Sequence, residues 1–236
     1  MHTTTKTSLL RSEEASKQVG GSGRWAAISG IGFVVLMLVG SMLVGDVPLP
    51  DAPVQEITDY LADTDRQMGN LIGAYSWVVG SLLFLLFAGR LRSELRSAEG
   101  GAGTLSNVNF AAGAAFSAVW AAAAGISGAI PFAIAVRGAP AIDPDLVRVL
   151  PAAGRFLLLL GGGFTGALFL VTAAVVIFRT GVFQRWLGGL GIVAAVALLF
   201  DIVYLNITPF WAWVLVTAVV MLTRRPKPTT PTPDAA

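Results

Sequence analysis

Six long apolar segments recur along this chain, and they constrain its fold more than any other feature of the sequence. An α-helix needs about 20 predominantly apolar residues to cross the hydrocarbon core of a bilayer. Only 13% of the residues are charged, against about 25% in soluble domains. We therefore predict an all-α integral membrane protein with six transmembrane helices in one bundle. The predicted spans are residues 25–45, 69–89, 107–135, 155–178, 186–205 and 209–223.

The two ends of the chain differ in composition from the apolar segments. Residues 1–23 are polar without apolar periodicity, and residues 224–236 are rich in Thr and Pro. We predict disordered tails there, flanking a transmembrane domain at residues 24–223. With six spans both tails share one side of the membrane, and that side carries most of the 16 Lys and Arg residues. The positive-inside rule therefore places both termini in the cytoplasm.

The first loop between predicted spans, residues 46–68, is acidic and contains a helical pattern. Pro53 can occupy a first helical turn, and Val54, Ile57 and Leu61 recur at helical spacing opposite acidic residues. Acidic side chains repel an anionic lipid surface. We therefore expect a short amphipathic helix whose apolar stripe packs on the protein.

A second helix start is predicted in the loop at residues 136–154. Asp143 is a suitable N-cap, and Pro144 follows it at the first helical position. This pair predicts one or two helical turns at the surface. Among the aromatic residues, Trp211 and Trp213 lie near the end of a span and fit an interfacial belt, whereas Trp120 lies deeper and is expected in the core.

Asp201 is the only acidic residue inside the apolar segments. A carboxylate at the centre of a transmembrane helix costs roughly 2.5–3.5 kcal/mol on insertion scales, so it marks a candidate site. Arg155 begins the fourth span at the same predicted outer depth. The other polar residues that we expect at this depth include Tyr204, Asn206, Asn70 and Tyr75.

Three interpretations of this candidate site stay open. An Arg155–Asp201 ion pair would fix the register of two helices. Alternatively, the polar residues would line an outward-facing pocket roofed by the acidic loop, or Asp201 would be a proton-coupling carboxylate.

Small residues recur at a spacing of four in two of the predicted spans. They are Gly113, Ser117, Ala121 and Gly125 in the third span, and Gly162 and Gly166 in the fourth. Such stripes let helices approach closely. They predict tight contacts with neighbouring spans or, alternatively, with another membrane protein.

The residue types in the chain give little support for a catalytic or cofactor site. The chain has no cysteine and one histidine, His2, which argues against thiolate ligands, a haem held by two histidines and a zinc cluster. Gly125-Ile126-Ser127-Gly128 matches the motif around the nucleophile of an intramembrane serine protease, but that chemistry needs a histidine base in another span. A net charge of +2 does not indicate a nucleic-acid partner. We expect a non-enzymatic protein without cofactor or metal.

Three segments carry a resemblance to a protein family. They are RWAAISGIGFVVLMLVG at the first span, FAGRLRSELRSAEGG after the second and RTGVFQRWLGGLGIVAAV entering the fifth. On these segments, residues 25–225 resemble an uncharacterised family of six-span bacterial membrane proteins that is common in actinobacteria. The resemblance implies a six-helix layout and a location in the bacterial cytoplasmic membrane, and it implies no activity.

The leading functional hypothesis is the binding or movement of a small amphiphile or lipid at the outer leaflet. It depends on the polar residues gathered at one depth and on the amphipathic outer loop. A ligand-free accessory subunit, docked to another membrane protein through the small-residue faces of spans 3 and 4, is the alternative. An intramembrane enzyme is the third hypothesis, and the missing membrane His and Cys disfavour it.

Overall fold

The computed structural model describes residues 25, 27–45, 47–49, 51–139, 142–200 and 207–224. Throughout these residues the secondary structure is helical and contains no strand, which confirms the predicted all-α class. Three helices are long and apolar enough to cross a membrane: α3 (Thr64–Glu99), α4 (Thr104–Ala135) and the continuous helix Pro144–Thr180. The shorter helices are Ala27–Leu43, α2 (Val54–Ala62), α7 (Arg185–Leu199) and α8 (Thr208–Thr223).

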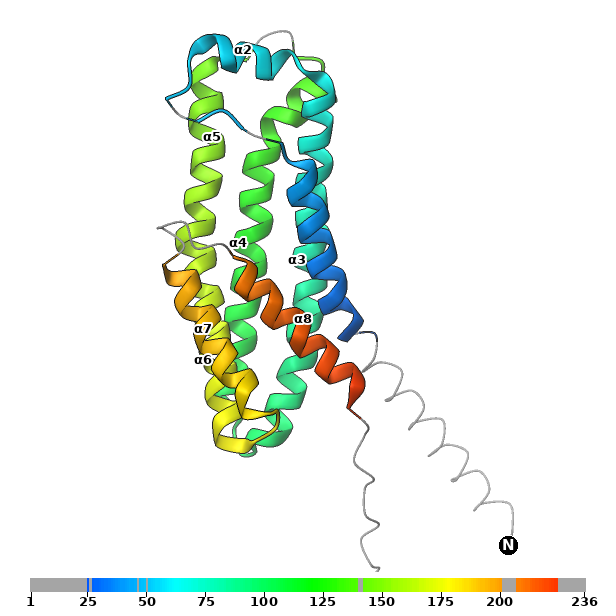
Figure 1. Cartoon of the computed structure of the whole chain (residues 1–236), viewed down its shortest axis with the longest axis vertical. Helices are drawn as coiled ribbons and strands as arrows, with labels where there is room; N and C mark the ends of the chain where they lie inside the picture. Colours follow the sequence, from blue (N-terminus) through cyan, green and yellow to red (C-terminus); the bar gives the residue numbers. More distant parts are fainter. Residues whose placement is uncertain are drawn as a thin grey trace, which may run out of the picture.

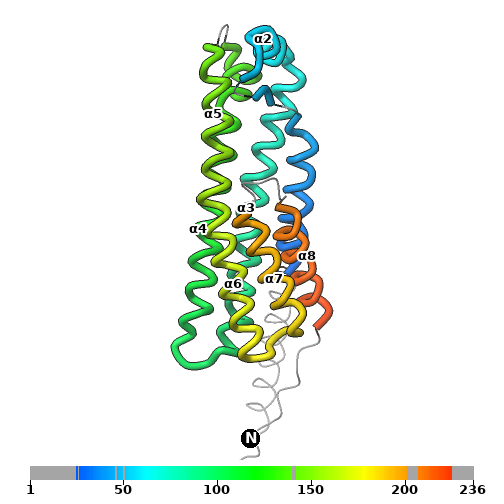
Figure 2. The backbone as a smooth tube through the Cα atoms, turned by 60° about the vertical axis from the view of Figure 1, so that its left-hand side comes forward, coloured from blue at the N-terminus to red at the C-terminus, as the bar shows by residue number. Residues whose placement is uncertain are grey.

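The long helices run side by side through the height of the molecule, and α2 lies across one end of them (Figure 1). We call this the α2 end, and we call the opposite end, where the α3–α4 turn lies, the turn end. Helices α7 and α8 accompany the long helices only through the half nearer the turn end (Figure 2). A Cβ on Gly163, near the middle of Pro144–Thr180, would lie 3.3 Å from the carbonyl oxygen of Leu198 at the end of α7. The half of the bundle nearer the α2 end is therefore formed by the other described helices.

The helix Pro144–Thr180 consists of α5 (Pro144–Leu157), a π turn (Leu158–Gly162) and α6 (Gly163–Thr180). The Asp143 side chain accepts a hydrogen bond from the backbone N–H of Asp145, which confirms the predicted N-cap. The expectation of only one or two surface turns after this cap is wrong. The helix continues because α5 buries Val147 and Gly154 against neighbouring elements, so packing sustains it beyond the apolar segment.

The core of the turn half is built from aromatic rings around Phe84 of α3, whose side chain is 0% exposed. Edge and tilted contacts of this kind add to the stabilisation that burial provides. The rings nearest to Phe84 belong to Phe33, Phe116, Phe169 and Phe210, at centroid distances of 5.1, 5.2, 5.2 and 5.6 Å. One core therefore joins the first helix, α3, α4, α6 and α8.

Tryptophans near the predicted span ends do not all lie at the surface. Trp120 is buried, as predicted, and its ring contacts Phe116. Trp211 and Trp213 are also buried, so their assignment to an interfacial belt is wrong. Trp213 is buried because α8 packs on α7. The indole N–H of Trp213 donates to the carbonyl oxygen of Leu187 in α7 (3.0 Å), so it has a hydrogen-bond partner inside the protein.

The small-residue stripes pack inside the chain at some positions and are open at others. A Cβ on Gly166 would lie 2.9 Å from Leu198 Cδ1 and 3.2 Å from the Phe116 ring, which confirms a tight contact with neighbouring helices. A Cβ on Gly113 would lie 3.1 Å from the Phe169 ring. At Gly125, by contrast, a Cβ would meet no atom of the described chain within 4 Å. Close packing is therefore confirmed at Gly113 and Gly166, Ser117 and Gly162 are also buried, and Gly125 is open.

Candidate functional site

Helix α2 is held against the α2 end of the bundle by its apolar stripe. Ile57 and Tyr60 are buried, and they belong to a cluster with Ile130 of α4 and Val147 of α5. The prediction that the stripe packs on the protein is confirmed for Ile57 and for the partly buried Leu61, whereas Val54, the third predicted member, is exposed. The acidic residues of α2 face outward, as the exposure of Glu56 and Asp59 indicates.

A buried hydrogen-bond network ties α2 to the helices below it. The Asn70 side chain of α3 donates from Nδ2 to the Tyr60 hydroxyl (2.8 Å) and accepts at Oδ1 from the backbone N–H of Gly45 (3.0 Å). Gln67 donates from Nε2 to the carbonyl oxygen of Tyr60 (2.7 Å). Burial raises the pKa of the Tyr60 phenol above its ordinary value, so the hydroxyl stays neutral at physiological pH. Asn70 therefore joins α2, α3 and the segment after the first helix.

Replacing Tyr60 by Phe is expected to destabilise the protein, because the Asn70 amide would lose its acceptor in a buried place. An unsatisfied buried donor costs about 1–3 kcal/mol. Tyr75→Phe is the matched control, since the Tyr75 side chain is 60% exposed. Melting temperatures in detergent should fall for the first variant and stay unchanged for the second. Equal melting of both variants would contradict a stabilising role for the network.

The α2 end also carries a groove lined by two arginines, which we call the arginine groove. Its volume is about 240 Å³, and it lies between the segment after the first helix and one face of α5. The residues of α5 recur at helical spacing, which is why they share this face. The groove is lined by Val47, Pro48, Leu49, Arg148, Pro151, Ala152, Arg155, Phe156 and Leu159.

The arginine groove combines positive charge with exposed apolar surface. Arg148 and Arg155 are seven residues apart on α5, so their side chains leave the same face of the helix. Nε of Arg148 lies 3.8 Å from Oδ1 of Asp145, whose side chain is 87% exposed. Leu49 and Phe156 are exposed beside the two guanidinium groups. An amphiphile with an anionic head matches this pairing of donors and apolar walls.

A second groove, of about 320 Å³, lies between α3 and α4. It is mainly apolar, and Gly125 and Gly128 hollow its α4 wall because they have no side chain. Tyr75 lies on its α3 wall. The lining residues are Leu71, Ala74, Tyr75, Val78, Ala124, Gly125, Gly128, Ala129 and Phe132.

The candidate site residues that the structure describes lie in three separate places. Asn70 belongs to the buried network, Tyr75 to the α3–α4 groove and Arg155 to the arginine groove. Asn70 and Tyr75 are five residues apart, which turns their side chains about 140° away from each other on α3. The remaining three, Asp201, Tyr204 and Asn206, lie outside the described residues. The Arg155–Asp201 ion pair therefore stays a prediction.

Sequence reasoning missed Tyr60, Arg148 and the wall formed by Val47–Leu49. Tyr60 was detectable, because it follows Ile57 by three residues and so shares the apolar stripe of α2. Arg148 was also detectable, seven residues before Arg155, once α5 is treated as part of the long helix. Comparison of the chain with known protein families, curated proteins and solved structures finds no match.

Proposed function

We propose that this chain is a non-enzymatic multi-pass membrane protein that binds a lipid or small amphiphile with an anionic head in the arginine groove. The observation that carries the proposal is the position of Arg148 and Arg155 on one face of α5, beside the exposed apolar side chains of Leu49 and Phe156. Guanidinium groups bind phosphate and carboxylate oxygens through paired hydrogen bonds. The apolar wall would take the first part of the hydrocarbon chain.

We further propose a six-span arrangement in a bacterial cytoplasmic membrane, with the α2 end outside. Three helices have the length and composition of membrane spans, and the helices Ala27–Leu43, α7 and α8 are apolar but shorter. Arginines gather at the turn end, at Arg90, Arg92, Arg96, Arg179 and Arg185. The positive-inside rule therefore favours a cytoplasmic turn end and an outward-facing acidic α2.

The short α7–α8 pair explains how a lipid would reach the groove. Helix α7 ends beside Gly163, and Arg155 lies eight residues earlier in the long helix. That separation is about 12 Å along the axis toward the α2 end. With the apolar run beginning at Phe156, Arg155 would lie at the outer boundary of the hydrocarbon core. An anionic head could then meet the arginines in water while its chain descends past Leu159.

Occupancy of the groove can be measured at a single site, because the chain has no natural cysteine. In an Ala152→Cys variant, phosphatidylglycerol is expected to slow the reaction of the thiol with a maleimide, whereas phosphatidylcholine has little effect. Adding Arg148→Gln and Arg155→Gln should raise the lipid concentration needed for protection by about tenfold, the effect of losing roughly 1.4 kcal/mol of binding. Arg137→Gln, a change to an exposed arginine at the same end, should leave protection unchanged.

Three results would contradict this function. They are protection that is equal for both lipids, protection that survives loss of both arginines, and protection that falls equally with the Arg137 control. The melting temperature of each variant without lipid shows whether a loss of protection reflects unfolding instead.

The ligand-free accessory subunit is a second candidate, and the α3–α4 groove favours it. Gly125, Gly128 and the exposed Phe132 leave a hollow apolar face that a helix of another membrane protein could fill. Gly166, in contrast, already contacts neighbouring helices of the chain. Gentle purification followed by mass spectrometry separates the candidates, since the accessory role requires a stoichiometric protein partner.

A further inference from the structure

At the turn end, two arginines of α3 converge on one side chain of α4. Arg92 donates from Nε (3.1 Å) and Nη2 (2.8 Å) to Oδ1 of Asn107, and Arg96 donates from Nη1 to the same oxygen (3.3 Å). The amide oxygen is neutral, so it does not balance either charge. Within the described part of the chain, no ion pair joins Arg92 or Arg96 to a carboxylate. Two positive charges are therefore held close together, and the side chain that joins them is neutral.

Further contacts hold these two side chains in place. The Arg92 guanidinium lies over the Phe110 ring, 5.3 Å from its centroid. Gly103 has a positive φ of 62°, and a Cβ there would lie 3.1 Å from Arg96 Cγ. The absence of a side chain at this turn thus makes room for Arg96. The donors are positioned before any ligand arrives, which lowers the entropy lost on binding.

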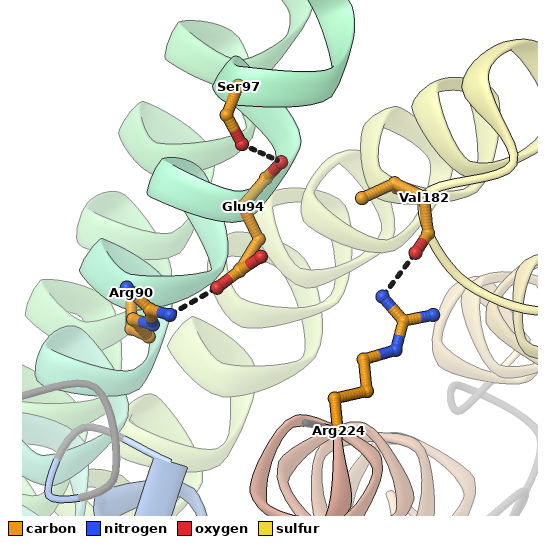
Figure 3. A network of polar contacts seen from close by, with 5 residues as sticks. All are labelled: Arg90, Glu94, Ser97, Val182 and Arg224. Carbon is orange, nitrogen blue, oxygen red and sulfur yellow. Dashed lines mark hydrogen bonds and ion pairs between the residues drawn. The ribbon is translucent and has the colours of Figure 1, made fainter. Parts of the chain in front are cut away.

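The acidic residues nearest to this pair in the sequence are already engaged. Between residues 66 and 142 the only acids are Glu94 and Glu99. Glu94 pairs with Arg90, one turn earlier on α3 (Figure 3). Glu99 accepts hydrogen bonds from the backbone N–H groups of Leu105 and Ser106, both at 2.9 Å, and so caps the start of α4.

From this geometry we infer that Arg92, Arg96 and Asn107 form a binding site for one phosphate group, supplied by an anionic phospholipid of the cytoplasmic leaflet. The Asn107 oxygen uses only some of the five N–H groups on each guanidinium, so Arg92 keeps a pair at Nη1 and Nη2 and Arg96 keeps a pair at Nε and Nη2 for phosphate oxygens. The Asn107 amide nitrogen adds a further donor. Arg92 lies three residues beyond Gly89, the end of the apolar run, which is about 4.5 Å farther along the helix. This depth fits the headgroup layer. The inference rests on the membrane placement proposed above but not on the arginine groove.

The test uses Arg148→Gln/Arg155→Gln protein as the starting chain, so that loss of the outer groove cannot be mistaken for loss of this site. Phosphatidylglycerol is titrated onto the detergent-purified protein, and bound lipid is counted by native mass spectrometry. Adding Arg92→Gln and Arg96→Gln should weaken the binding of one lipid by about tenfold or more. Adding Arg90→Gln and Arg185→Gln instead removes the same number of charges at the same end, and should leave that lipid bound.

A conservative variant separates binding from folding. Arg92→Lys/Arg96→Lys keeps both charges but loses the paired donors, so its affinity should fall between those of the starting chain and the Gln variant. Melting without lipid should be similar for the starting chain and the Lys variant. Equal lipid binding by the Gln variant and the charge-matched control would overturn the site, because general attraction between charges would then explain the binding.

The source of the phosphate is distinguished with soluble probes. Inorganic phosphate and glycerol phosphate are added in place of the lipid, and the rise in melting temperature is measured. For a lipid site, phosphatidylglycerol should raise the melting temperature at concentrations where the soluble probes do not. If the soluble probes act equally well, and only when Arg92 and Arg96 are present, the assignment to a lipid is overturned in favour of a soluble phosphate ligand.

Discussion

Phe84→Ala is expected to lower the free energy of unfolding by about 3 kcal/mol, at the lower end of the range for emptying a buried phenylalanine site. The side chain is 0% exposed, and four other phenylalanine rings lie within 5.6 Å of its centroid. The lower end applies because in lipid the loss comes mostly from packing contacts rather than from transfer out of water. Unfolding by SDS titration in mixed micelles gives the measurement.

Leu86→Ala is the matched control for this change. Leu86 lies two residues further along α3, but its side chain is 59% exposed and would face lipid. Its truncation removes three apolar carbons without emptying a packed site, so stability should change little. Equal losses for Phe84→Ala and Leu86→Ala would mean that the aromatic cluster does not hold the bundle together.

Gly166→Leu is expected to have a similarly large effect through the opposite mechanism, which is excess volume. A Cβ alone would approach Leu198 Cδ1 to 2.9 Å and the Phe116 ring to 3.2 Å, and leucine adds three more carbons. Overfilling a packed core costs about 1–3 kcal/mol, and the upper end applies here because both α4 and α7 must move. The melting temperature in detergent should fall sharply.

Gly189→Leu tests whether the Gly166 effect is local. Gly189 is also helical, yet a Cβ at this position would meet no described atom within 4 Å. The same substitution should therefore be tolerated there, apart from the gain in helix propensity that any residue has over glycine. If the Gly166 variant melts like the parent, that face of α6 is not packed as described.

The apolar segments predicted where helices lie, but not where helices end. Hydropathy drops at Arg90, yet α3 continues to Glu99, because Leu91 and Leu95 are buried at one-turn spacing among the polar residues. The same is true of α5, where Val147 is the buried residue. A span is recognised by its apolar composition, whereas a helix beyond the span needs only one apolar stripe.

The candidate site was predicted less well than the fold. The sequence indicates the depth of a polar residue along its helix, but the direction of its side chain around the helix axis decides which groups meet. Asn70 points to Tyr60, while Tyr75 lines the α3–α4 groove. Arg155 does line a groove, although the wall facing its helix comes from Val47–Leu49, a segment far away in the sequence. Contacts of that kind depend on tertiary packing that no local pattern encodes.

The π turn at Leu158–Gly162 controls the angular phase between the two ends of the long helix. An uninterrupted α-helix turns about 100° per residue, so Gly154 and Gly166 would point about 120° apart. The extra residue of the π turn reduces this difference to about 20°. Both glycines accordingly face α4, where added Cβ atoms would approach Ser127 Oγ to 2.7 Å and the Phe116 ring to 3.2 Å. Deleting one residue from this turn would give a regular α-helix in which Gly154 and Gly166 still point about 20° apart. The π turn thus accommodates one more residue while α5 and α6 continue to face α4 with the same side of one long helix.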